Sequence, residues 1–187
     1  MLDEKHNPWQ IKGEKKVYDN NWISLTHYDV LNPAGKDGIY GKVHFKNIAV
    51  GVIPLDEHHN TWLVGQYRFV LNEYSWEIPE GGGPIGIDPL ESIKRELLEE
   101  TGLVAKEWQP ILRMHLSNSV SDELSIIYLA RDFQQLNSEP EETEQLEVRK
   151  LPFEEVYQMV SDERITDAMS VAAILKIKLM LINGEIS

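Results

Sequence analysis

The first half of the chain alternates apolar and polar residues in short runs that turn-forming residues separate. Between Trp22 and Phe45, two alternating or β-branched segments flank NPAGKDG, a run of turn formers. This pattern is typical of a β-hairpin. Two further apolar runs, NIAVGVIPL and TWLVGQYRF, follow with the polar DEHHN between them. They predict a second, more buried pair of strands.

The second half combines further strand runs with helical periodicity. Strands are predicted in WQPILRMHLS, LSIIYLARDF and LEVRKL, and the acidic NSEPEETEQ predicts a loop. Helices are predicted near 89–101, 153–160 and 167–182, and the glycine-rich PEGGGPIG interrupts the strand pattern before the first of them. This order predicts one mixed α/β domain, with a strand region at 1–45 and the main part at 46–187.

Composition and charge narrow the classes of function. The 187 residues are 42% hydrophobic, which is ordinary for a globular chain that buries a sizeable core. A formal net charge of -13 argues against nucleic-acid and anionic-membrane surfaces, because these depend on clustered Lys and Arg. The lack of cysteine excludes disulfides, thiolate metal sites and cysteine nucleophiles. With a polar start and no long apolar run, we expect a cytoplasmic, soluble protein.

The helix at 89–101 has clear local end signals. Asp88 can cap it, Pro89 suits its first position, and Glu91 completes a pattern like a capping box. Gly102 marks its end.

Three glutamates of this helix, Glu96, Glu99 and Glu100, are spaced three and four residues apart and therefore share one face. Their mutual repulsion costs roughly 0.2–0.5 kcal/mol per pair, and the last turn of a helix favours cations instead. A solvated acidic helix end is one interpretation. A seat for a hard divalent cation such as Mg²⁺, which prefers carboxylate oxygens, is the other, and we favour it.

These residues also carry a family resemblance. The segment GGGPIGIDPLESIKRELLEETGL resembles the Nudix box. Ile87 departs from the pattern, because the family has a glutamate at that place. The positions in register are Gly81, Arg95, Glu96, Leu97, Glu99, Glu100, Gly102 and Leu103.

The resemblance implies a Nudix fold, an α/β/α sandwich with a mixed β-sheet. It implies Mg²⁺-dependent hydrolysis of a nucleoside diphosphate linked to another moiety, with Mn²⁺ as a possible substitute. By position, the implied metal ligands are the main-chain carbonyl of Glu80 and the carboxylates of Glu96, Glu99 and Glu100, the last of which also counts as catalytic. Arg95 is implied to pair with Glu99 and orient it.

A second segment points to a subfamily. TWLVGQYRFVLNEYSWEIPEGG resembles a stretch of ADP-ribose pyrophosphatases and nucleoside-diphosphate-sugar hydrolases, in which Arg68 matches an arginine that reaches the substrate phosphates or terminal sugar. The N-terminal hairpin resembles one that packs across a two-fold dimer in that subfamily. By that likeness, Trp22 and Tyr40 would stack on the base in a homodimer with hairpin exchange, and Glu123 would contact the terminal sugar.

The resemblance also implies a glutamate that takes a proton from the attacking water, on a loop after the late strands. Counting back from LEV, Glu142 matches best and Glu144 is next. One departure concerns specificity: Asn118, in LSNS, stands where enzymes selective for ADP-ribose have a proline. A broader nucleoside-diphosphate-sugar substrate is therefore expected, with ADP-ribose and GDP-mannose as candidates.

Three alternatives stay open at this point. A nucleoside-triphosphate or dinucleoside-polyphosphate hydrolase would use the same metal helix. A Nudix-fold sensor would bind a nucleotide sugar without turnover, although sensors commonly lose box glutamates that this chain retains. An acidic interaction or Ca²⁺-binding protein is disfavoured, because the box lacks the spacing of an EF-hand loop.

Overall fold

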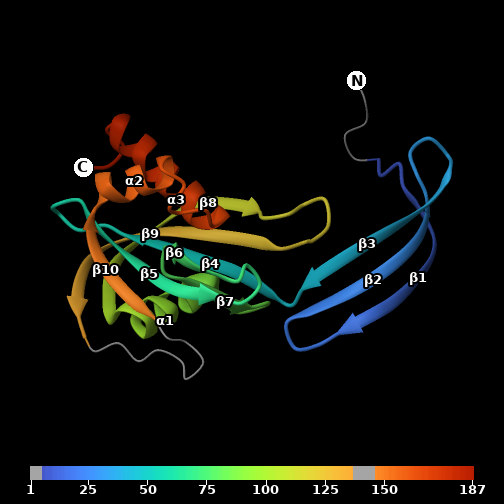
Figure 1. The fold of residues 1–187 in the computed structure, drawn as a ribbon, viewed down its shortest axis with the longest axis horizontal. Coiled ribbons are helices and arrows are strands. Elements are labelled where there is room, and N and C mark those ends of the chain that lie inside the picture. Colours follow the sequence, from blue (N-terminus) through green and yellow to red (C-terminus); the bar gives the residue numbers. More distant parts are fainter. Residues whose placement is uncertain (1–5, 137–145) are drawn as a thin grey trace. The chain divides into compact units, whose positions relative to one another are not determined.

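A computed structural model describes residues 6–136 and 146–187 of the chain (Figure 1). The chain is organised in two compact units. The N-terminal unit comprises Met1–Asn47 with Ser117–Glu123, and the main unit comprises Ile48–Leu116 with Leu124–Ser187.

The N-terminal unit is built on a three-stranded antiparallel sheet in the order β1-β2-β3. Its strands are β1 (Gln10–Asp19), β2 (Ile23–Leu31) and β3 (Asp37–Phe45). β2 and β3 form the predicted hairpin, whereas β1 was not predicted. Nearly all of β1 is exposed and it is rich in lysine, so its sequence carries no alternation between buried and exposed positions.

A segment distant in sequence completes this unit. Val43 of β3 donates its amide to the carbonyl of Val120 and accepts from the amide of Asp122. The Asp122 carboxylate in turn accepts from the amide of Phe45 at 3.0 Å and contacts Lys42 at 3.1 Å and His44 at 2.8 Å. Residues 117–123 are therefore tied to the end of β3.

The main unit contains two sheets, of order β7-β4-β9-β8 and β10-β5-β6. β4 runs parallel to β9 and β8 runs antiparallel to it, so the larger sheet is mixed, as predicted. The strands are β4 (Asn47–Pro54), β5 (Asn60–Arg68), β6 (Glu73–Glu77), β7 (Glu80–Pro84), β8 (Leu103–His115), β9 (Leu124–Gln135) and β10 (Glu147–Pro152).

The predicted pairing of the two buried strands β4 and β5 is wrong, because they lie in different sheets and an isolated bridge from Leu55 to Thr61 joins their ends. β4 pairs with β7 and β9, and β5 pairs with β6 and β10. The centres of both strands are apolar and buried on both faces, and such a run does not specify its partner.

The glycine-rich segment was expected to interrupt the strand pattern, but its first part forms the strand β7. The glycines serve close packing against a helix. A Cβ on Gly83 would lie 2.8 Å from Ser92 Oγ, and a Cβ on Gly81 would collide with the carboxylate of Glu96. At Gly83 the close approach of β7 to the helix requires glycine, whereas at Gly81 the absence of a Cβ leaves room for the Glu96 carboxylate.

The three predicted helices are present as α1 (Pro89–Thr101), α2 (Phe153–Ser161) and α3 (Ala168–Ile182). The Asp88 carboxylate caps α1 by accepting from the amide of Leu90 at 3.0 Å. Gly102 ends it in the left-handed conformation, with φ of 73°, and donates to the carbonyl of Leu98. Among the helices of the described residues, none is long and apolar enough to cross a bilayer.

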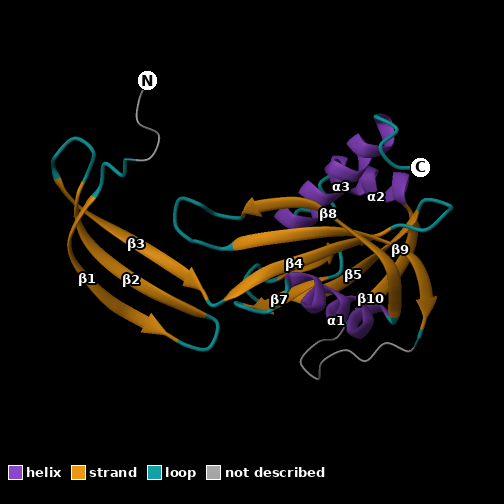
Figure 2. Ribbon diagram, turned by 180° about the vertical axis from the view of Figure 1, so that it is seen from behind, coloured by secondary structure: helices purple, strands orange, loops and turns teal. Residues whose placement is uncertain are grey.

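Within the main unit, α1 covers one face of the sheets, and α2 and α3 cover the other (Figure 2). Alternation along β4 and the residue after it supplies both layers, because Val50 and Val52 pack with α1 whereas Ile53 and the following Leu55 pack with α2 and α3. The predicted α/β/α sandwich is therefore confirmed.

Candidate active site

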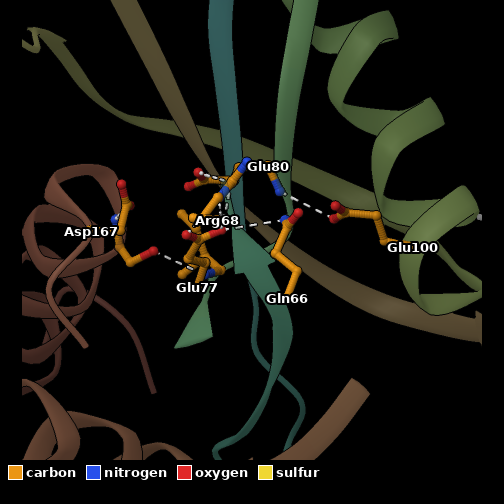
Figure 3. A network of polar contacts seen from close by, with 8 residues as sticks. Gln66, Arg68, Glu77, Glu80, Glu100 and Asp167 are labelled. Atoms are coloured by element: carbon orange, nitrogen blue, oxygen red, sulfur yellow. Dashed lines mark hydrogen bonds and ion pairs between the residues drawn. The ribbon is translucent and has the colours of Figure 1, made fainter. Parts of the chain in front are cut away.

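Two glutamates in the last turns of α1 contact β7. The Glu100 side chain is buried, and its Oε2 accepts a hydrogen bond of 3.2 Å from the backbone N–H of Glu80 (Figure 3). The carboxylate of Glu96 occupies the space that a Cβ on Gly81 would fill. Two of the three predicted glutamates thus lie against the start of β7.

Arg95 joins the other two carboxylates. Its Nη1 donates to Glu99 Oε2 at 2.6 Å, and its Nη2 donates to Glu96 Oε1 at 2.5 Å. Partial burial alone would lower the pKa of Arg95, but the two carboxylates outweigh this effect and the pKa is raised. The structure therefore contains the Arg95–Glu99 contact that the sequence predicts and adds Glu96 to it.

Arg68, at the end of β5, is held by acidic residues from the following strands. Its Nε lies 2.9 and 3.1 Å from the two carboxylate oxygens of Glu77, and its Nη2 donates to Glu77 Oε2 at 2.5 Å. Nη2 also contacts Glu80 Oε1 at 3.2 Å. The Glu77 side chain is only 3% exposed, whereas the Arg68 side chain is 38% exposed, so the cation is partly solvated while its counterion is buried.

Glu80 places a buried carboxyl group at the centre of this network. Burial raises its pKa well above the ordinary value, and the negative charges of Asp167 and Glu77 raise it further, while Arg68 opposes them. Its Oε2 is buried and has no hydrogen-bond partner. Sequence analysis assigned a role to the main-chain carbonyl of Glu80, and the structure adds this side chain.

Asp167, at the start of α3, is a further negative charge near Arg68 and Glu80. Asp167 caps the helix by accepting from the amide of Ser170 at 2.7 Å, and Ser170 Oγ accepts from the amide of Ile78 at 3.0 Å. Glu77, Asp167 and Ser170 were not identified from the sequence. The charged Glu77 within the apolar run YSWEIP was the one available signal.

A family model named NUDIX domain matches residues 45–170 of the chain. The chain belongs to the NUDIX family. Two curated relatives are similar over most of their length. An ADP-ribose pyrophosphatase of Bacillus subtilis (strain 168) is 29% identical over 169 residues, which cover 89% of this chain and 91% of the relative. A CMP-5'-(N-acetyl-N-hydroxy-3-aminopropyl)phosphonate hydrolase of Streptomyces rubellomurinus is 26% identical over 169 residues, 90% of this chain and 82% of the relative.

A crystal structure described as an ADP compounds hydrolase has the same fold. It superposes with a TM-score of 0.84 at 19% identity, covering 95% of this chain and 97% of that one. The chain is therefore a Nudix hydrolase with the Nudix fold, and α1 is its Nudix helix.

The donor chemistry of the Nudix helix fits a divalent metal ion. Carboxylate oxygens are the ligands that hard cations prefer, and the carboxylates of Glu96 and Glu100 meet β7 at Gly81 and at the Glu80 amide. Within 6–136 and 146–187, no three His, Asp or Glu side chains stand together as a ready cluster for a metal ion. Arg95 donates one hydrogen bond to Glu96 and one to Glu99, so it fixes both carboxylates.

The remaining predicted residues of this Nudix hydrolase belong to the N-terminal unit or to residues 137–145. Trp22, immediately before β2, is 65% exposed. Tyr40 donates its hydroxyl to the carbonyl of Ser119 at 2.6 Å, and its ring meets Trp9 edge-on at 5.5 Å. Glu123 ends the 117–123 segment. Glu142 and Glu144 lie outside the described residues.

Strand register separates the two predicted stacking residues. Tyr40 pairs with Tyr28, whereas Ile23, next to Trp22, pairs with Phe45. Trp22 and Tyr40 are thus several residues apart along the hairpin, on the order of 15–20 Å at the rise of a strand. A single chain does not bring the two rings onto the two faces of one base.

Proposed function

We propose that this Nudix hydrolase cleaves the diphosphate of nucleoside diphosphate sugars, of the ADP-ribose and GDP-mannose class, in a Mg²⁺-dependent reaction. The products would be a nucleoside monophosphate and a sugar phosphate. The observation that carries the proposal is the contact of Glu100 with the Glu80 amide, which holds the acidic face of α1 against β7. The likeness to the Bacillus subtilis ADP-ribose pyrophosphatase, over most of both chains, supports the substrate class.

The proposed metal ligands are Glu96, Glu99, Glu100 and the main-chain carbonyl of Glu80. Bound Mg²⁺, or Mn²⁺ in its place, would neutralise diphosphate charge and lower the pKa of a coordinated water. Arg95 has a positioning role, because its two hydrogen bonds fix the carboxylates of Glu96 and Glu99 before substrate arrives.

Arg68 is the proposed phosphate contact. Its bonds to Glu77 fix the plane of the guanidinium, so little rotational freedom remains to be lost when an anion binds. The Arg68 side chain is partly exposed, so a phosphate oxygen or the terminal sugar could reach it from solvent.

The water-activating base is proposed to be Glu142, with Glu144 as the second choice and Glu100 as an additional catalytic carboxylate. Trp22 and Tyr40 are proposed to stack on the base in a homodimer. Their separation along one hairpin favours an arrangement in which two copies of the chain each contribute a ring. Glu123 is proposed to contact the terminal sugar.

Substrate selection is proposed to be broader than ADP-ribose alone. Asn118 replaces the proline of ADP-ribose-selective enzymes, and the Streptomyces relative is named for a CMP conjugate. Turnover of substrates that carry different nucleotide bases should therefore be compared directly.

The experiment is a substrate panel with Mg²⁺ or Mn²⁺, in which chromatography resolves the products. The panel contains ADP-ribose, GDP-mannose, a CMP-linked compound, nucleoside triphosphates and dinucleoside polyphosphates. We expect a nucleoside monophosphate and a sugar phosphate from the first two substrates. Preferred release of pyrophosphate from triphosphates would contradict the proposal, and so would tight binding of nucleotide sugars without turnover.

A further inference from the structure

The connection between β6 and β7 lies between the two residues that contact Arg68. Ile78 and Pro79 lead the chain from β6, in one sheet of the main unit, to β7, in the other. Glu77 ends β6 and Glu80 begins β7, and the carboxylates of both contact Arg68 (Figure 3). The position of this short connection therefore decides where both counterions of Arg68 lie.

Two hydrogen bonds hold the backbone of this connection. The Pro79 carbonyl accepts from the amide of Val52, in β4, at 3.0 Å. The Ile78 amide donates to Ser170 Oγ of α3, also at 3.0 Å, in a buried position. Because proline has no N–H, the Ile78 amide is the one backbone donor that the connection has to place. Ser170 supplies the acceptor for it.

The first turn of α3 is fixed in a way that presents this hydroxyl. The Asp167 carboxylate caps the helix by accepting from the Ser170 amide at 2.7 Å. Ser170 is fully buried, whereas the other buried residues of α3 are all apolar. A buried hydroxyl needs a hydrogen-bond partner, and alanine is the better helix former. The contact with Ile78 therefore explains why a serine stands at this position.

Side-chain packing brings the same two segments together. A Cβ on Gly51 of β4 would lie 2.9 Å from Ile78 Cδ1 and 2.9 Å from Met169 Cε. The side chains of Ile78 and Met169 thus both lie over Gly51, one from the connection and one from the residue before Ser170. The connection rests directly against the first turn of α3.

We propose that Ser170 is a positioning residue for Arg68. By holding the Ile78 amide, it fixes Glu77 and Glu80 around the guanidinium, so that Arg68 meets the substrate in one orientation. Ser170 does not touch the substrate itself. The inference rests on the proposed role of Arg68 as the phosphate contact. The alternative is a hydroxyl that only stabilises the fold.

The first test needs no substrate and compares Ser170→Ala with Ile174→Val in ¹⁵N-labelled protein. Ile174 is fully buried one turn further along α3, so its truncation loosens the same helix and leaves the Ser170–Ile78 hydrogen bond in place. In Ser170→Ala, hydrogen exchange of the Ile78 amide should rise by at least about tenfold relative to that of the Val52 amide.

The same spectra report on Arg68 directly. Its Nε–H signal, which depends on the hydrogen bond to Glu77, should shift in Ser170→Ala. In Ile174→Val, both the exchange ratio and this signal should match the unsubstituted protein. If Ser170→Ala does not fold, Ser170→Cys keeps the volume with a weaker acceptor and should give the same changes at smaller size. An Arg68 signal that neither Ser170 variant moves would overturn the proposal.

The second test is kinetic. Ser170→Ala should raise KM for the best substrate about fivefold with little change in kcat, because a phosphate contact acts in the ground state and the transition state alike. Ser170→Thr, which keeps the hydroxyl, should bring KM back toward the unsubstituted value, and Ile174→Val should not change it. An equal rise of KM in Ile174→Val would show a purely structural role and overturn the proposal.

Arg68→Gln separates this inference from the proposed function. If Arg68→Gln raises KM and Ser170→Ala does not, the positioning role of Ser170 is wrong. If neither variant raises KM, Arg68 is not the phosphate contact, and the inference falls together with that assignment. If no nucleotide sugar is turned over, the proposed function fails, while the NMR comparison still decides whether Ser170 positions Arg68.

Discussion

Arg68 and Glu77 form a close ion pair in which the Glu77 side chain is almost fully buried and the Arg68 side chain is partly exposed. The pair links the end of β5 to the end of β6, and Arg68 extends the contact to Glu80 at the start of β7. Breaking a buried pair leaves one charge uncompensated, which is costly even where forming the pair gains little. The acidic site is thus built on a contact that also stabilises the fold.

Glu77→Gln should therefore lower the free energy of unfolding by about 1–3 kcal/mol, less than for a wholly buried pair because Arg68 is partly solvated. Urea denaturation measures the change. Glu73→Gln is the matched control, because Glu73 is exposed on the same strand and lies opposite Arg68 in the register. Equal stability losses in the two variants would show that the buried pair has no special role.

Glu99→Gln should reduce kcat/KM for the best substrate by at least about 100-fold, if its carboxylate is a metal ligand. Its side chain is partly exposed, so the thermal midpoint should change little. Glu91→Gln serves as the control, since Glu91 lies on the first turn of the same helix and pairs with Lys94. Near-normal turnover in Glu99→Gln would remove the metal-helix hypothesis.

Gly81→Ala tests whether the Glu96 carboxylate must lie against β7. The added Cβ would be 2.5 and 2.7 Å from the two carboxylate oxygens, so the flexible end of Glu96 must move while the backbone can stay. We expect the metal concentration for half-maximal activity to rise by about tenfold, with a small change in thermal midpoint. Gly41→Ala, where the Cβ meets nothing within 4 Å, should leave both quantities unchanged. An unaltered metal requirement in Gly81→Ala would place Glu96 outside the metal site.

Ionisation of Asp56 makes the free energy of unfolding of the main unit depend on pH. Partial burial raises its pKa, but hydrogen bonds from Lys150, Asn60 and His58 outweigh this and lower the pKa from 3.8 to about 2. A depressed carboxyl pKa stabilises the folded state above the unfolded pKa, and this stability is lost as pH falls toward the folded value. The contribution is on the order of 1–2 kcal/mol.

Between about pH 5 and pH 2, Asp56→Asn should thus lose less unfolding free energy than the unsubstituted protein, although it is less stable at neutral pH. Chemical denaturation at a series of pH values measures this difference. The exposed Asp162→Asn is the control and should follow the unsubstituted curve. Parallel curves for Asp56→Asn and the unsubstituted protein would contradict the assignment.

Local signals explain what could be predicted from the sequence. The ends of α1 depend on Asp88 and Gly102, which lie next to the helix, and the shared face of its glutamates follows from helical spacing. The Arg95–Glu99 contact spans one helical turn, and the resemblance to the Nudix box implied it.

Contacts between elements explain what could not be predicted. Glu77, Glu80 and Asp167 come from β6, β7 and the start of α3, and no local pattern specifies that these three meet around Arg68. The partner of β4 was wrongly predicted because a strand buried on both faces carries no sign of its neighbour. β7 was missed because its glycines serve the approach of α1, a requirement visible only after the helix is in place.

The connection between β8 and β9 has a practical consequence for dissecting this protein. Residues 117–123 belong to the N-terminal unit, while the strands on either side belong to the main unit, so the polypeptide crosses between the units three times. Deleting everything before Ile48 would strip Asp122 of Lys42, His44 and the Phe45 amide. The N-terminal sheet therefore cannot be exchanged as one continuous segment. A chimera that carries it on another hydrolase must also include residues 117–123.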